Sequence, residues 1–135
     1  MPTIRSKYLG ELRTEAIHLA STSKLITDAP LDNQGKGEAF SPTDLAGAAL
    51  GSCMLTIMGI ASRTYGINLE STEAEITKIM ASNPRRISAI EIRFFNLPTN
   101  LSAHDQALLE RSARACPVAL SLHPEIEQRV TFEWK

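Results

Sequence analysis

The 135-residue chain predicts an α+β fold within a single domain, residues 1–135. Its apolar pattern predicts strands before residue 41, a long central helix, two further strands, a second helix and a final strand. Because helices and strands do not alternate strictly, a doubly wound parallel sheet is disfavoured. Hydrophobic residues make up 43% of the chain and charged residues 21%, a balance typical of folded globular proteins.

Two short strands are predicted near the N-terminus. Residues facing opposite ways alternate from Leu12 to Leu19, and a second short run covers Lys24–Asp28. The segment Asp32–Gly37 follows, and its Asp, Asn and Gly residues favour turns and tolerate positive φ. We therefore expect two strands and then a loop.

The central helix has clear start and stop signals. Ser41 can cap the helix, Pro42 suits its first position, and Asp44 completes a capping box. The helix can run to about Tyr65, where Gly66 provides a stop.

This helix carries no charged residue from Leu45 to Ser62, a length that raises the question of a membrane span. Its many Gly, Ala, Ser and Thr residues instead favour the buried centre of a soluble fold. A helix without a polar face must be covered on every side, and a chain of this length has little sheet for that purpose. We therefore expect a second copy of the chain to cover part of it.

The second half of the chain predicts a hairpin, a helix and a strand. The hairpin comprises Ile67–Met80 and Ile87–Phe95, with Ile90, Ile92 and Phe94 on one face of its second strand. A capping pattern predicts a helix from Leu101 to about Pro117, and alternation predicts a last strand that contains Val130, Phe132 and Trp134.

Composition narrows the possible functions. The net charge of −1 and the pI near 6.3 argue against a nucleic-acid binder. The N-terminal residues lack the apolar stretch of a signal peptide, so we expect a cytoplasmic protein with reduced cysteines. The cysteines and histidines show none of the short spacings of a zinc site, so no metal is expected.

The two cysteines, Cys53 and Cys116, are the candidate chemical groups. Small neighbours surround Cys53 in the central helix, and its sequence context alone also fits a packed core cysteine. Cys116 precedes Pro117 at the expected start of a short helical turn, where backbone N–H groups favour a thiolate. Local physics therefore predicts that Cys116 is the more acidic thiol.

Two segments resemble the motifs of the OsmC/Ohr family of thiol peroxidases. Phe40–Cys53, FSPTDLAGAALGSC, looks like the family's central motif, and Ala115–Leu120, ACPVAL, looks like its second cysteine motif. The order of the motifs and the surrounding pattern of strands and helices also fit, so the resemblance covers nearly the whole chain.

The resemblance implies an intertwined homodimer in which long central helices are wrapped by antiparallel sheet, with active sites at the subunit interface. It implies that Cys53 attacks an organic hydroperoxide and that Cys116 resolves the sulfenic acid as a disulfide. A dithiol such as a dihydrolipoyl group would then reduce the protein, with no cofactor, metal, nucleic acid or membrane involved.

The sequence departs from the peroxidase branches of this family at one position. Those branches carry a glutamate that holds a catalytic arginine, where this chain has Thr43 followed by Asp44. Neighbouring helical positions point about 100° apart, so Asp44 is not an automatic substitute. The resemblance places this arginine in the N-terminal strand region, where Arg13 is the candidate and Arg5 is the only other possibility.

Three interpretations therefore follow from the sequence. The first is a reductase of organic hydroperoxides that uses Cys53, Cys116 and Arg13, with Asp44 as a further candidate. The second is a small-ligand-binding protein on the same fold, which the departure at Thr43 favours. The third is a stress-related dimer whose cysteines only pack.

Overall fold

The structure, a computed structural model, describes all residues 1–135 and contains two compact units. The first unit comprises Met1–Ala46 and the second Gly47–Lys135. Helix α1, Pro42–Tyr65, begins in the first unit and continues into the second. The α+β class predicted from the sequence is confirmed.

The first unit is built on a three-stranded antiparallel sheet of order β1-β2-β3. Its strands are β1 (Ile4–Gly10), β2 (Arg13–His18) and β3 (Lys24–Asp28), and a 3₁₀ turn, η1, follows at Leu31–Asn33. The two predicted strands are confirmed. Strand β1 was not predicted, because it is an exposed edge strand whose mixed residues give little burial pattern.

Helix α1 begins with the predicted capping box. The Ser41 hydroxyl accepts a hydrogen bond from the Asp44 backbone N–H at 3.0 Å, and the Ser41 N–H donates to the Asp44 carboxylate at 2.9 Å. The helix ends at Tyr65, and Gly66 follows with a φ of +67°, the left-handed conformation that glycine adopts readily. Both predicted boundaries are confirmed.

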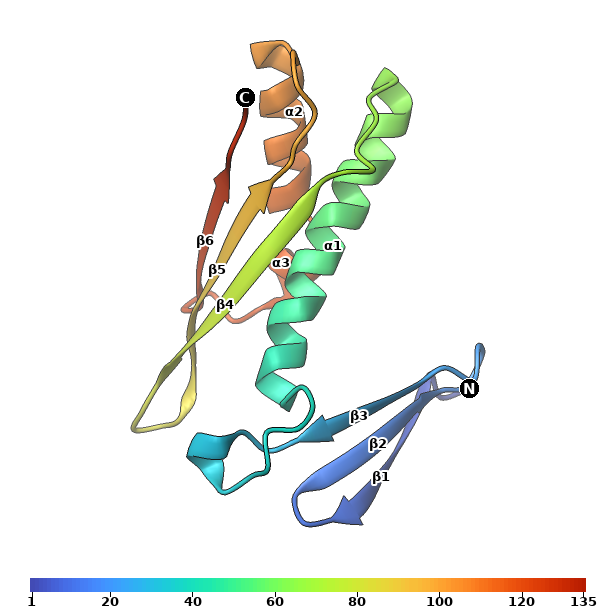
Figure 1. Ribbon diagram of the computed structural model, residues 1–135, viewed down its shortest axis with the longest axis vertical. Coiled ribbons are helices and arrows are strands. Elements are labelled where there is room, and N and C mark those ends of the chain that lie inside the picture. Colours follow the sequence, from blue (N-terminus) through green and yellow to red (C-terminus); the bar gives the residue numbers. More distant parts are fainter. The chain divides into compact units, whose positions relative to one another are not determined.

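The second unit packs helices against one face of a three-stranded sheet of order β4-β5-β6 (Figure 1). Its strands are β4 (Glu73–Ala81), β5 (Arg86–Phe95) and β6 (Glu127–Phe132). Its helices, besides α1, are α2 (Ala103–Arg114) and α3 (Pro117–Ser121). The sheet is mixed, because β4 pairs antiparallel with β5 whereas β6 pairs parallel with it after the crossover through α2 and α3.

The predicted hairpin is confirmed except for its start. Residues 67–72 form a turn rather than a strand, because the Asn68 side chain accepts from the Glu70 N–H and the Thr72 N–H bonds to the Leu69 carbonyl. The predicted second helix is also confirmed, with Ser102 as its cap.

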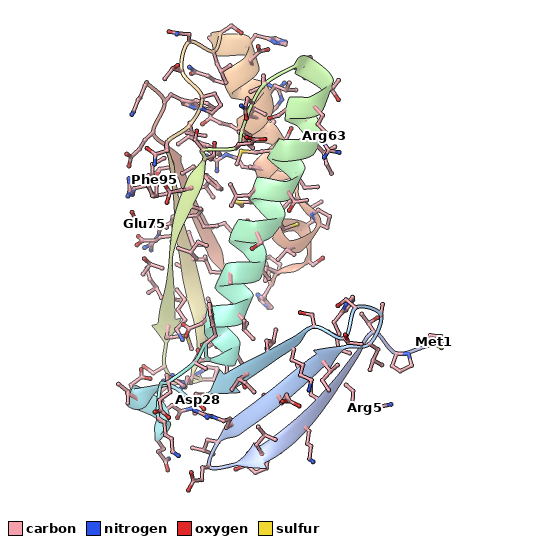
Figure 2. All side chains as sticks on the ribbon, turned by 45° about the vertical axis from the view of Figure 1, so that its right-hand side comes forward. Met1, Arg5, Asp28, Arg63, Glu75 and Phe95 are labelled. Atoms are coloured by element: carbon pink, nitrogen blue, oxygen red, sulfur yellow. The ribbon has the colours of Figure 1, made fainter.

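The core of the second unit lies between α1, α2 and β5. The predicted apolar face of β5 is confirmed, since Ile90, Ile92 and Phe94 are all buried. The other core side chains come from the helices and the segments beside them: Leu50, Met54, Met58, Leu97, Leu109, Ala113, Cys116 and Ala119. The opposite face of the sheet carries ion pairs, such as that of Arg93 with Glu75, and Phe95 packs against Arg93. Figure 2 shows Glu75 and Phe95 on the side away from α1.

Candidate dithiol site

Cys53 lies on α1 in the second unit, in a stretch of small residues. It is half-buried and packs against the hydrophobic core, while its neighbours Ser52 and Thr56 are exposed. The Thr56 hydroxyl donates to the Ser52 carbonyl at 2.8 Å, and this bond holds the Thr56 side chain along the helix. Cys53 is therefore the more exposed of the two thiols.

Cys116 lies at the N-terminal cap of α3 and is fully buried. Its Sγ accepts a hydrogen bond from the Ala119 backbone N–H at 3.4 Å. Its own N–H donates to the Ala113 carbonyl at 3.2 Å, which ties the residue to the end of α2. The predicted position of Cys116 before a short helical turn is confirmed.

The two thiols meet within the second unit. Both belong to the same hydrophobic core cluster, and Cys53 lies close enough to raise the pKa of the Cys116 thiol. The raised pKa favours the protonated form of Cys116.

The prediction that the helix terminus would make Cys116 acidic is wrong. Burial is the largest influence, and it raises the pKa of Cys116 because an apolar environment disfavours the thiolate. The Ala119 N–H lowers the pKa, but burial and Cys53 together outweigh it. The sequence showed the helix start but could not show how completely the sulfur is buried.

Arg13 lies in the first unit, on β2, and two carboxylates hold its guanidinium. Nε and Nη2 donate to the two oxygens of Asp28 at 2.7 and 2.8 Å, and Nη2 also donates to Glu38 at 3.1 Å. Asp28 is 1% exposed, and Figure 2 labels it at the end of β3. The hydrogen bond from Arg13 lowers the pKa of Asp28.

Sequence reasoning missed Asp28 and Glu38. The signal for Asp28 was present in the strand register, because Arg13 and Asp28 are direct cross-strand partners of β2 and β3. Glu38 lies beyond η1 in a loop, and no periodic pattern places a loop residue. Asp44, in contrast, is confirmed as a capping residue of α1.

No group of three or more His, Cys, Asp or Glu side chains gathers where it could hold a metal ion. The second unit thus holds a pair of free thiols. The first unit, taken by itself, holds an arginine that bonds two carboxylates. Such a pair of thiols defines a dithiol protein of α+β fold.

Comparison with known proteins agrees with this class. A family model described as OsmC-like protein matches residues 35–131. The chain therefore belongs to the OsmC-like family. The comparison with curated proteins found no match.

Solved structures also match over almost the whole chain. A Psychrobacter arcticus protein, provisionally described as an osmotic stress induced and detoxification response protein, is 51% identical with a TM-score of 0.93, over 98% of this chain and 96% of its own. An organic hydroperoxide resistance protein from Legionella pneumophila is 18% identical with a TM-score of 0.72, over 98% of both chains. Another from Elizabethkingia anophelis is 15% identical with a TM-score of 0.67, over 100% of this chain and 98% of its own. The last two show a shared fold.

Proposed function

We propose that the chain reduces organic hydroperoxides through a two-cysteine cycle, with Cys53 as the attacking thiol and Cys116 as the resolving thiol. The observation that carries this proposal is that a half-buried Cys53 lies near a fully buried Cys116 in one hydrophobic core cluster. Only the less buried sulfur can meet a substrate. The buried sulfur can react with the first one.

The proposed cycle has an oxidation step at Cys53 and a resolution step at Cys116. The Cys53 thiolate attacks the distal oxygen of the hydroperoxide, the O–O bond breaks, and the alkoxide takes a proton to leave as an alcohol. Cys53 is then a sulfenic acid. The Cys116 thiol condenses with it, releases water and forms the disulfide, which an external dithiol such as a dihydrolipoyl group reduces by exchange.

The raised pKa of Cys116 supports this division of roles. A thiol that keeps its proton is a poor nucleophile toward peroxide, since the thiolate is the reactive form. The proposed cation of the site is Arg13, which would stabilise negative charge that develops on the reacting oxygen and sulfur.

We also propose a homodimer in the cytoplasm. The sheet of the first unit exposes the apolar side chains Ile4, Tyr8 and Leu25, and α1 exposes Ile60. The register of the strands places Ile4, Tyr8 and Leu25 on one face. A second copy that covers these surfaces would remove them from water, and sedimentation of the purified protein without detergent tests this.

Length and composition alone would allow α1 to cross a membrane, because its most apolar 18-residue window has a mean hydropathy of 1.7. The core helix of a soluble protein passes the same test. The residues that α1 buries include Leu50, Met54 and Met58, which pack in the core of the second unit. This packing favours the soluble dimer over a membrane span.

The proposed cycle is tested by intact mass. The reduced protein is exposed to one equivalent of cumene hydroperoxide, alongside Cys53→Ser and Cys116→Ser. We expect wild type to lose two hydrogen atoms, Cys116→Ser to gain one oxygen atom and Cys53→Ser to remain unchanged. An unchanged wild-type mass would contradict the proposal.

The second candidate is a small-ligand-binding protein on the same fold, and Thr43 is the observation that favours it. The Thr43 hydroxyl lies 3.1 Å from the Ser41 hydroxyl, so this position contributes a capping-region hydroxyl rather than a carboxylate. Native mass spectrometry of the purified protein would show a retained small molecule in this case. A protein without bound ligand would count against it.

A further inference from the structure

The end of α1 and the turn that follows it border a pocket within the second unit. The pocket has a volume of about 350 Å³, and Gly59, Ser62 and Arg63 of α1 line it together with residues 67–70. That volume lies at the lower end of the range of about 300–1,000 Å³ for small-molecule sites. Ser62 lies nine residues beyond Cys53, which is about 14 Å further along the helix axis. Neither cysteine lines the pocket, so it is separate from the two thiols.

Hydrogen bonds within the turn hold one wall of the pocket in place. The Ile67 N–H donates to the Ser62 carbonyl at 2.9 Å, and the Asn68 side chain accepts from the Glu70 N–H at 2.9 Å. Ile67 and Leu69 are half-buried and pack against the hydrophobic core, so they give the pocket an apolar side. The pocket is therefore formed without a bound ligand.

Ser62 is the most buried residue that lines this pocket, and its hydroxyl has no partner. The residue is 2% exposed, and its Oγ makes no hydrogen bond. Buried hydroxyl groups nearly always have a hydrogen-bond partner, because burial without one costs free energy. Rotation about the Cα–Cβ bond moves Oγ between three staggered positions. A ligand in the pocket can thus bond this hydroxyl without any movement of the backbone.

Two opposite charges border the same pocket without pairing. Arg63, which Figure 2 labels near the end of α1, and Glu70 are exposed, and the side chain of neither forms an ion pair. In contrast, Arg93 and Arg129 on the sheet each pair with two carboxylates. The helix dipole favours a cation in the last turn of α1, but it gives no role to Glu70. Both charges are therefore available to a ligand.

We propose that this pocket binds a small zwitterion, namely a free α-amino acid with an apolar side chain. Its carboxylate pairs with Arg63 and accepts from the Ser62 hydroxyl, and its ammonium group pairs with Glu70. Its side chain covers Ile67 and Leu69. A simple anion would face the uncompensated Glu70 carboxylate, and a simple cation would face Arg63, so a ligand with both charges matches the pocket best. This site does not depend on the proposed peroxide cycle.

Titration of isotope-labelled protein with L-leucine at millimolar concentration, followed by NMR, tests the proposal. We expect saturable shifts of the backbone amides of residues 59–70. Two matched compounds each lack one charge, since isocaproate has no ammonium group and isoamylamine has no carboxylate. Each should bind about 10-fold more weakly than leucine, because it loses a charge-assisted hydrogen bond. The absence of saturable shifts with leucine would overturn the proposal, as would equally tight binding of either analogue.

Variants then assign the binding to the pocket. Arg63→Gln and Glu70→Gln change exposed side chains without ion pairs, so both should fold and bind leucine about 10-fold more weakly. Ser62→Ala removes an unpartnered hydroxyl, so it should keep its stability and also bind leucine more weakly. Arg111→Gln is the matched control, because Arg111 is an exposed arginine of α2 outside the pocket, and it should bind leucine like wild type. Wild-type affinity in any of the three pocket variants would overturn the proposal.

Discussion

Gly51 of α1 packs directly against Ile76 of β4. A Cβ atom at Gly51 would lie 2.4 Å from Cδ1 and 3.0 Å from Cγ1 of Ile76, closer than real Cβ contacts allow. At Gly47, one turn earlier, the corresponding distance to Cγ2 of Ile76 is 3.3 Å. Two glycines therefore let the helix approach the sheet closely, just before it presents Cys53.

Gly51→Ala should destabilise the fold despite the better helix propensity of alanine. Overpacking costs about 1–3 kcal/mol, and alanine recovers only about 1 kcal/mol in a helix. Ile76→Val removes Cδ1, so the double variant should be more stable than the two single changes predict, with a coupling of about 0.5–3 kcal/mol. Urea unfolding of wild type, the two single variants and the double variant measures this coupling energy. Gly59→Ala is the control, because a Cβ there meets nothing within 4 Å.

Cys116 should resist alkylation in the folded protein. Its sulfur is fully buried, and the raised pKa keeps it protonated at neutral pH. In a Cys53→Ser variant we expect iodoacetamide to label Cys116 much more slowly than in urea-unfolded protein. Labelling should accelerate only at pH values above the ordinary thiol pKa of about 8.5. Equal labelling of folded and unfolded protein at neutral pH would show that the thiol is accessible.

The same pKa shift predicts how alkaline pH affects stability. The folded protein holds the Cys116 proton more tightly than the unfolded chain, so the resulting stabilisation is present below the ordinary thiol pKa. It is lost as pH rises through the higher folded pKa. Wild type should therefore lose free energy of unfolding between about pH 8 and pH 11 more steeply than Cys116→Ala. Parallel curves for the two proteins in urea titrations would contradict this prediction.

The sequence predicted those elements whose signals are local. The Ser41 and Ser102 caps, the stop at Gly66 and the alternation on β5 all depend on neighbouring residues, and each was found in the structure. The edge strand β1 has little burial pattern, and so it was missed.

The candidate functional residues also differ in whether local sequence reveals them. The cysteine motifs and Arg13 are visible in the sequence, whereas the environment of Cys116 depends on residues from α1, α2 and α3 that only folding brings together. Asp28 is the partner of Arg13 because of the register between β2 and β3. The sequence alone does not determine that register.

Ser102→Ala should weaken α2. The Ser102 hydroxyl accepts from the Asp105 N–H at 3.1 Å, so alanine would leave that N–H without its cap. We expect a loss of about 1 kcal/mol in the free energy of unfolding. Ser102→Asp should retain most of the stability, because a carboxylate can cap the same N–H and is favoured at a helix N-terminus. Thermal melts of wild type, Ser102→Ala and Ser102→Asp compare their stabilities directly.

Acid pH should destabilise the first unit through Asp28. The hydrogen bond from Arg13 is the main cause of the lowered pKa of Asp28, and the Glu38 N–H adds to it. A carboxyl whose folded pKa is depressed contributes stability above its ordinary pKa, about 3.9, and this contribution is lost as pH falls toward the lower folded value. Hydrogen exchange of the β2 and β3 amides should therefore accelerate in wild type below about pH 4, after correction for intrinsic exchange.

Asp28→Asn should lack this acid response, because its amide does not titrate. Its β2 and β3 amides should exchange faster than those of wild type at pH 6, and the two proteins should converge as the pH falls. Amides of β5, in the second unit, provide the internal reference. If the corrected exchange of β2 and β3 in wild type stayed constant down to pH 3, Asp28 would not be the acid-sensitive support of Arg13.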